Sequence, residues 1–116
     1  MSQKLLALTL IFLGEICLVY AEIVGAHEHG IGTQTFLSVF IKMFPITIIG
    51  GGLLIAGYIT GYRAFQNIWI VSVISITSIL LEEPLISWIT FHQLPTRGGW
   101  LGLAFGVAGL GSALFI

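Results

Sequence analysis

Four of the five acidic side chains in this sequence lie inside or at the border of long apolar runs: Glu15, Glu22, Glu82 and Glu83. Such positions are unusual, because an ionisable group near the centre of a bilayer costs about 2.5–3.5 kcal/mol on insertion scales. A glutamate that is kept there is a candidate for function, since it can bind a proton or a cation in alternation.

Glu15 has the deepest expected position. It lies about 15 Å into the apolar run that begins at Leu5, at 1.5 Å per helical residue, which is close to the midplane of a bilayer. Glu22, two turns further along nearly the same helix face, falls near the far interface, where it can reach head groups or water. We expect Glu15 to bind a proton or a substrate and Glu22 to be an interfacial acid. The alternative for Glu15 is a protonated side chain that hydrogen-bonds to a neighbouring helix.

Glu82 and Glu83 form a second acidic position. Adjacent residues of a helix point about 100° apart, so at most one of the two faces a given cavity. Pro84 follows and removes a backbone donor, which frees the carbonyl near Leu80. Glu82 and Glu83 are predicted either to bind a proton or substrate along a polar track shared with Glu15, or to be structural hydrogen-bonding groups.

His27 and His29 flank Glu28 and are the strongest candidates for a metal site. Two histidines are only half of such a site, because zinc sites usually have three or four ligands. We expect a polar loop here, with no metal and no cofactor. The sequence also contains no Cys–His or Ser–His–Asp arrangement and no phosphate-binding loop, so we expect no enzymatic activity.

The composition predicts an integral membrane protein. Of the 116 residues, 57% are hydrophobic and 8% are charged, whereas soluble domains carry about 25% charged residues. The net charge of −1 and the four basic residues argue against binding to nucleic acid. We expect a multi-pass protein of the inner (plasma) membrane of a bacterium, with membrane lipid as its surroundings.

A spanning helix needs about 20 mostly apolar residues, and four runs meet or approach this length. We expect one all-α membrane domain over residues 1–116, a four-helix bundle with short loops and spans at about 5–24, 44–62, 68–91 and 98–116. Residues 35–43 are a candidate interfacial segment, because Pro45 fits the first turn of a helix. GAHEHGIGTQ is expected to be a polar link. A rival interpretation of residues 1–21 is a cleaved secretory signal, in which Glu15 would fit poorly.

The basic residues give no preferred orientation, because two fall on each side of the membrane: Lys4 and Arg63 on one, Lys42 and Arg97 on the other. This balance follows either from a small number of charges or from insertion in both directions, which would produce an antiparallel dimer.

Small residues recur every four positions in the last run, at Gly98, Gly102 and Gly106. Such rows let helix backbones approach closely in lipid, so this row is a candidate helix-packing or dimer seam. Trp69 and Trp88 are candidates for stacking on a cation, or for anchoring at the interface, where tryptophan is enriched.

Residues 61–110, GYRAFQNIWIVSVISITSILLEEPLISWITFHQLPTRGGWLGLAFGVAGL, resemble the closing two-helix unit of the drug/metabolite transporter superfamily, of the EamA-like and small multidrug resistance kinds. FHQLPTRGGWLG stands where that unit has a short polar turn and the start of a glycine-rich helix. GEI at 14–16 is similar to the mid-helix glutamate of small multidrug resistance exporters. The resemblance implies that Glu15 is the carboxylate that binds proton and substrate, and that the chain works as a dimer.

The sequence therefore predicts a small transporter that exports or exchanges a cationic or amphipathic solute by alternating access, coupled to protons. The expected partner is either a second copy of the chain, for which an antiparallel arrangement is one option, or a paired homologue. Two alternatives stay open, a non-transporting membrane subunit or scaffold and a lipid-carrier flippase subunit of the same superfamily.

Overall fold

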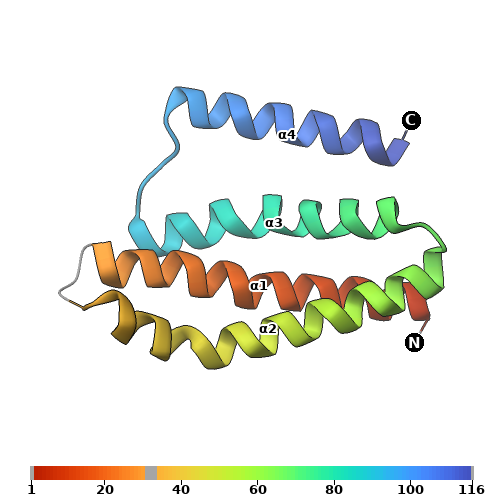
Figure 1. The fold of residues 1–116 in the computed structure, drawn as a ribbon. Coiled ribbons are helices and arrows are strands. Elements are labelled where there is room, and N and C mark those ends of the chain that lie inside the picture. The colour runs from red at the N-terminus through yellow and green to blue at the C-terminus, as the bar shows by residue number, and fades with distance from the viewer. Residues whose placement is uncertain (1, 31–33, 116) are drawn as a thin grey trace.

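The computed structural model describes residues 2–30 and 34–115, and this part of the chain is all-helical. Its four helices are α1 (Gln3–Gly30), α2 (Phe36–Phe65), α3 (Ile68–Phe91) and α4 (Arg97–Phe115). Successive helices reverse direction, so α1 and α3 run the same way (Figure 1). The predicted all-α class with four helices is confirmed.

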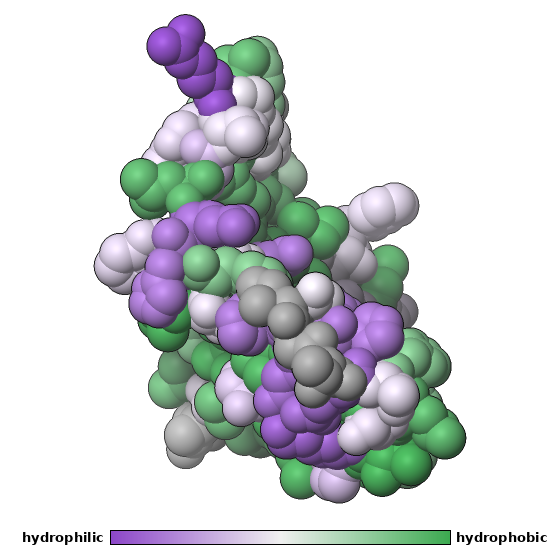
Figure 2. All heavy atoms as spheres, turned by 90° about the vertical axis from the view of Figure 1, so that its left-hand side faces the viewer, coloured by the Kyte–Doolittle hydropathy of each residue, from purple (hydrophilic) through white to green (hydrophobic). Residues whose placement is uncertain are grey.

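Three of the described helices, α1, α2 and α3, are long and apolar enough to cross a membrane. Hydrophilic side chains gather at the end of the molecule where α1 and α3 finish and α2 begins, while apolar side chains cover much of the flanks (Figure 2). A polar end beside apolar flanks is the distribution expected of helices that end at a bilayer surface.

Local sequence explains where α2 and α3 begin and end. Thr35 and Asn67 are the N-caps of α2 and α3, and their side-chain oxygens accept hydrogen bonds from the backbone N–H groups of Ser38 and Trp69. Both helices finish at a left-handed residue, Gln66 and His92, each with φ 56°.

Helix α1 continues past the end of the predicted span, through GAHEHG to Gly30, so the first part of the expected polar link is helical. Two contacts hold these last turns. Lys42 of α2 lies 2.6 Å from a carboxylate oxygen of Glu28, and the His27 ring packs edge-on against Phe91 of α3 with 5.0 Å between centroids. The prediction of a loop overlooked these tertiary contacts; the remainder of the link includes residues 31–33, which lie outside the described residues.

Helix α2 is one continuous helix from Phe36 to Phe65, with Pro45 inside it rather than in its first turn. The structure therefore has no break between the segment expected at the interface, 35–43, and the span expected to start near residue 44. Proline removes the hydrogen bond to the carbonyl of Ile41 and bends a helix locally, and α2 is visibly bowed in its first half (Figure 1).

The packing of α1 on α2 depends on glycines. A Cβ atom on Gly57 would lie 2.7 Å from Cγ1 of Ile11, and one on Gly50 would lie 2.8 Å from Cβ of Cys17. A Cβ on Gly14 would similarly meet Leu54 at 2.8 Å. These distances are too short for any side chain, so the two backbones are as close as they are only because these residues are glycines.

Helix α4 lies to one side of the other three and contacts only α3 (Figure 1). None of its described residues is buried. The layer formed by α1, α2 and α3 therefore contains the buried interior, and α4 adds an outer wall beside α3.

Candidate functional site

Glu15 lies at the interface of α1 and α3. Its side chain is buried, with 6% of its surface exposed, and it accepts a hydrogen bond from the hydroxyl of Ser75 on α3. Gly14 beside it packs against α2, so α1 contacts both α2 and α3 at this level. The predicted deep position of this glutamate corresponds to burial between helices.

Glu82 is buried on the same face of α3 as Ser75, with 4% of its surface exposed. Among the described residues, neither of its carboxylate oxygens has a hydrogen-bond partner. Buried polar groups almost always have such partners, so an acid of this kind is a candidate for ligand or ion binding.

A narrow polar stripe connects the two acids. The buried residues of α3 recur at helical spacing as Val71, Ser75, Ser78 and Glu82, and this face packs on α1. Side chains of a helix lean toward its N-terminus, so Glu82 leans back toward the turn that carries Ser78. The structure thus places Glu15 and Glu82 among the buried residues of the packed helices α1 and α3.

No basic side chain of the described residues reaches this stripe. Lys4 lies over the ring of Phe65, 5.4 Å from its centroid, and Lys42 pairs with Glu28. Arg63 and Arg97 stand in the last turn of α2 and the first turn of α4. Among the described residues, therefore, neither buried acid has a lysine or arginine partner.

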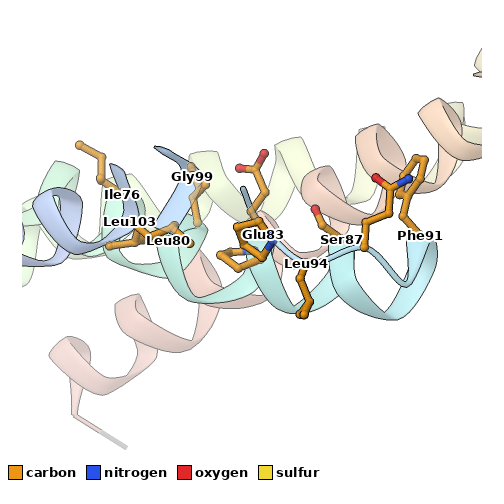
Figure 3. Close-up of a pocket in the computed structure, with 12 residues that line it drawn as sticks. Ile76, Leu80, Glu83, Ser87, Phe91, Leu94, Gly99 and Leu103 are labelled. Atoms are coloured by element: carbon orange, nitrogen blue, oxygen red, sulfur yellow. The ribbon is translucent and has the colours of Figure 1, made fainter. Parts of the chain in front are cut away.

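Glu83 points away from this site. It is exposed and lines a groove of about 640 Å³ between α3 and α4, together with Pro84, Ser87 and Gln93. Glu83 and Ser87 project from the same side of α3 into this groove (Figure 3). The remaining lining residues are apolar or glycine: Ile76, Ile79, Leu80, Phe91, Leu94, Pro95, Gly99 and Leu103.

Pro84 leaves one backbone carbonyl of α3 without its usual helical donor. Pro84 has no N–H group to donate to Leu80, and Leu80 lines the groove next to Glu83. A carboxylate and a hydroxyl on an apolar wall suit a ligand with a cationic, hydrogen-donating head and an apolar body. The expected 100° separation of Glu82 and Glu83 places one acid in the interior and the other in this groove.

Glu22 is exposed and lines a second groove, of about 430 Å³, between α1 and the first half of α2. Phe36 and Phe40, whose rings stack with 5.9 Å between centroids, form part of its wall. Glu22, two turns beyond Glu15 on α1, is therefore exposed where Glu15 is buried, and it does not join the polar stripe.

Trp69 and Trp88 do not line the groove of Glu83. They are 77% and 50% exposed on α3, and neither stacks on a cation among the described side chains. Their exposure agrees with the second interpretation, anchoring at an interface.

The row Gly98, Gly102 and Gly106 lies on α4, and little packs on it within the chain. A Cβ on Gly106 would meet Leu80 of α3 at 3.4 Å, an ordinary contact, whereas Gly102 faces open space. Gly98 has only Thr96 nearby, at 3.9 Å. The seam predicted from this row therefore remains a prediction.

His27 and His29, the histidines of the expected polar link, both contact other residues of the chain. His27 contacts Phe91, and Nδ1 of His29 lies 2.9 Å from the carbonyl oxygen of Gln34. The described residues contain no group of three or more His, Cys, Asp or Glu side chains that could hold a metal ion.

Ser75 and Ser78 are the functional candidates that sequence reasoning missed. Both are small hydroxyl residues in an apolar run and look like ordinary helix-packing positions. Their spacing from Glu82 was the available signal, because positions 75, 78 and 82 share one face of a helix.

Comparison with protein-family models, with curated proteins and with solved structures finds no match to this chain.

Proposed function

We propose that this chain is an integral membrane transporter that exchanges a small cationic or amphipathic solute for protons. The observation that carries the proposal is the buried pair Glu15 and Glu82, which lies between α1 and α3 with no basic partner among the described residues. A structural acid of this burial would normally be neutralised by a neighbouring lysine or arginine.

The two acidic positions have different roles in this proposal. Glu15 exchanges a proton with the aqueous phase when the helices around it rearrange, and Ser75 orients its carboxylate. Glu83 attracts the cationic head of the solute to the groove between α3 and α4, whose apolar wall accommodates the rest of the molecule.

The position of α4 supports alternating access. This helix contacts only α3, follows a short connection over residues 92–96, and has no buried residue among those described. Little apolar contact opposes its movement, so the groove can open or close at a small cost in free energy. The proposal includes a dimer, in which a second copy packs on the exposed glycine face of α4.

Flux in proteoliposomes tests the proposal. We expect an imposed proton gradient to drive uptake of one or more cations from a panel of tetraphenylphosphonium, ethidium and guanidinium, and Glu15→Gln to abolish the uptake. Glu22→Gln is the matched control, because Glu22 lies on the same helix but outside the polar stripe, and it should retain uptake.

A non-transporting membrane subunit is the second candidate, and one observation favours it. The outer face of α4 is apolar and uncovered, with Phe105 69% exposed and Val107 60% exposed, as expected of a helix that binds a partner. Flux that is equal in empty vesicles and in vesicles with the protein, for every cation of the panel, would favour this alternative.

A further inference from the structure

The two carboxylate oxygens of Glu82 are the most unusual polar atoms of the described chain. Both are fully enclosed and neither accepts a hydrogen bond from a described residue. A single proton on Glu82 would occupy one carboxylate oxygen and leave the other without a partner. A bound cation satisfies both oxygens at once.

The neighbouring hydroxyl hydrogens are already used. Ser75 donates to Glu15, and Ser78 donates to the carbonyl oxygen of Ile74 at a distance of 2.9 Å. A serine hydroxyl that donates its hydrogen keeps two lone pairs on the oxygen. The stripe therefore offers Glu82 no hydrogen-bond donors, but it presents several oxygen acceptors on one helix face.

Oxygen acceptors without donors are the chemistry that a hard cation needs. Carboxylate and hydroxyl oxygens are ligands of hard cations, whereas softer transition metals prefer nitrogen or sulfur. Cys17 is the nearest sulfur on α1, and it points to Gly50 of α2 instead. Of the other acids on α1 and α3, Glu15 is buried, Glu22 and Glu83 are exposed, and Glu28 pairs with Lys42.

A groove lies beside Ser78. Ser78 lines a groove of about 500 Å³ between α1 and α3, whose wall also carries the hydroxyl residues Thr9 and Thr77. The rest of the wall is apolar: Leu8, Phe12, Leu13, Ile74 and Leu81. The groove therefore borders the stripe at Ser78.

We propose that Glu15, Ser75, Ser78 and Glu82 form a binding site for one sodium ion, which competes with a proton for the two carboxylates. The inference rests on the proposed function, because it names a second coupling ion for the same site. The site is neutral with two protons, or with one proton and one sodium ion. Exchange between these states releases one proton for each sodium ion bound.

Thermal unfolding of the purified full chain in detergent, followed by circular dichroism, tests this proposal without any solute. We expect NaCl to raise the Tm by about 5 °C relative to choline chloride at equal ionic strength, because a ligand that binds only the folded state stabilises it. KCl should give a much smaller shift. Lowering the pH should reduce the sodium effect, because protons occupy the same carboxylates.

Two variants identify the site. Glu82→Gln should remove the sodium-dependent shift, whereas the adjacent Glu83→Gln, which faces the other groove, should keep it. If Glu82→Gln does not fold, Ser78→Ala provides the test, because it retains both charges and removes one oxygen. We expect it to raise the sodium concentration that gives half of the Tm shift about fivefold.

Equal shifts in NaCl, KCl and choline chloride would overturn the proposal. So would a sodium-dependent shift that survives Glu82→Gln, or a larger Glu82-dependent shift with calcium, which would assign the site to a divalent ion. These results leave the transport proposal standing if solute still drives proton exchange. Conversely, a sodium-specific Tm shift in a protein that moves no cation would contradict the transport proposal and would leave the sodium site standing.

Discussion

The hydroxyl of Ser75 on α3 donates a hydrogen bond to the carboxylate of Glu15 on α1, and both side chains are buried. This contact joins the first and third helices at a buried acid. It orients one carboxylate oxygen and leaves the other free for a proton or an ion.

Ser75→Ala should destabilise the protein, because it removes the only hydrogen bond that the described residues give to the Glu15 carboxylate. The expected loss in the free energy of unfolding is about 1–3 kcal/mol, the cost of an unsatisfied buried polar group. Reversible unfolding in mixed detergent micelles measures it. Ser72→Ala, one turn earlier and only half-buried, should change stability by less than about 0.5 kcal/mol.

Glu82→Leu should have the opposite effect in sodium-free buffer. A buried carboxyl without a hydrogen-bond partner opposes folding, and an apolar side chain of similar size fills the same space. We expect the free energy of unfolding to rise by about 1–2 kcal/mol while transport is lost. Glu83→Leu is the control and should leave stability nearly unchanged, since Glu83 is exposed. A large destabilisation by Glu82→Leu would assign the carboxyl a structural role.

Gly57→Ala should disrupt the packing of α1 on α2. The added Cβ would lie 2.7 Å from Cγ1 of Ile11 and 3.0 Å from its backbone nitrogen, and the backbone cannot yield locally. The expected cost is about 1–3 kcal/mol. Gly52→Ala meets nothing within 4 Å and should be neutral or slightly stabilising, because alanine is the better helix former. Equal effects of the two substitutions would show that the close crossing is absent in the protein.

Glu83→Gln separates solute binding from proton exchange. We expect the KM for a transported cation to rise about tenfold, the effect of losing a charged hydrogen-bond acceptor in a partly open groove, with proton-coupled turnover at saturation preserved. Ser87→Ala, on the same wall, should raise the KM less. A lowered turnover with an unchanged KM would instead place Glu83 on the proton path.

Much of this arrangement could be predicted from composition and helical geometry. The burial of Glu15 follows from its depth in an apolar run, and the separation of Glu82 from Glu83 follows from the 100° between neighbouring helical residues. The roles of the glycines were harder to assign: of Gly50, Gly51 and Gly52, only Gly50 touches another helix.

Other features depend on contacts that the local sequence does not show. The last turns of α1 are helical although GAHEHG resembles a loop, because Glu28 and His27 have partners on α2 and α3. Pro45 stays inside α2 because the helix bends rather than ends there. Ser75 is a candidate functional residue because α3 packs on α1 and brings its hydroxyl to Glu15. Nothing in the sequence alone pairs these two residues.

The measurement that tests the transport proposal most directly is proton release from the purified protein in weakly buffered detergent solution when a transported cation is added. We predict that the wild-type protein releases up to one proton per chain near neutral pH, that Glu15→Gln releases none, and that Glu22→Gln behaves like the wild type. Equal proton release from the wild-type protein and from Glu15→Gln would contradict the assignment of the buried carboxylate as the coupling site.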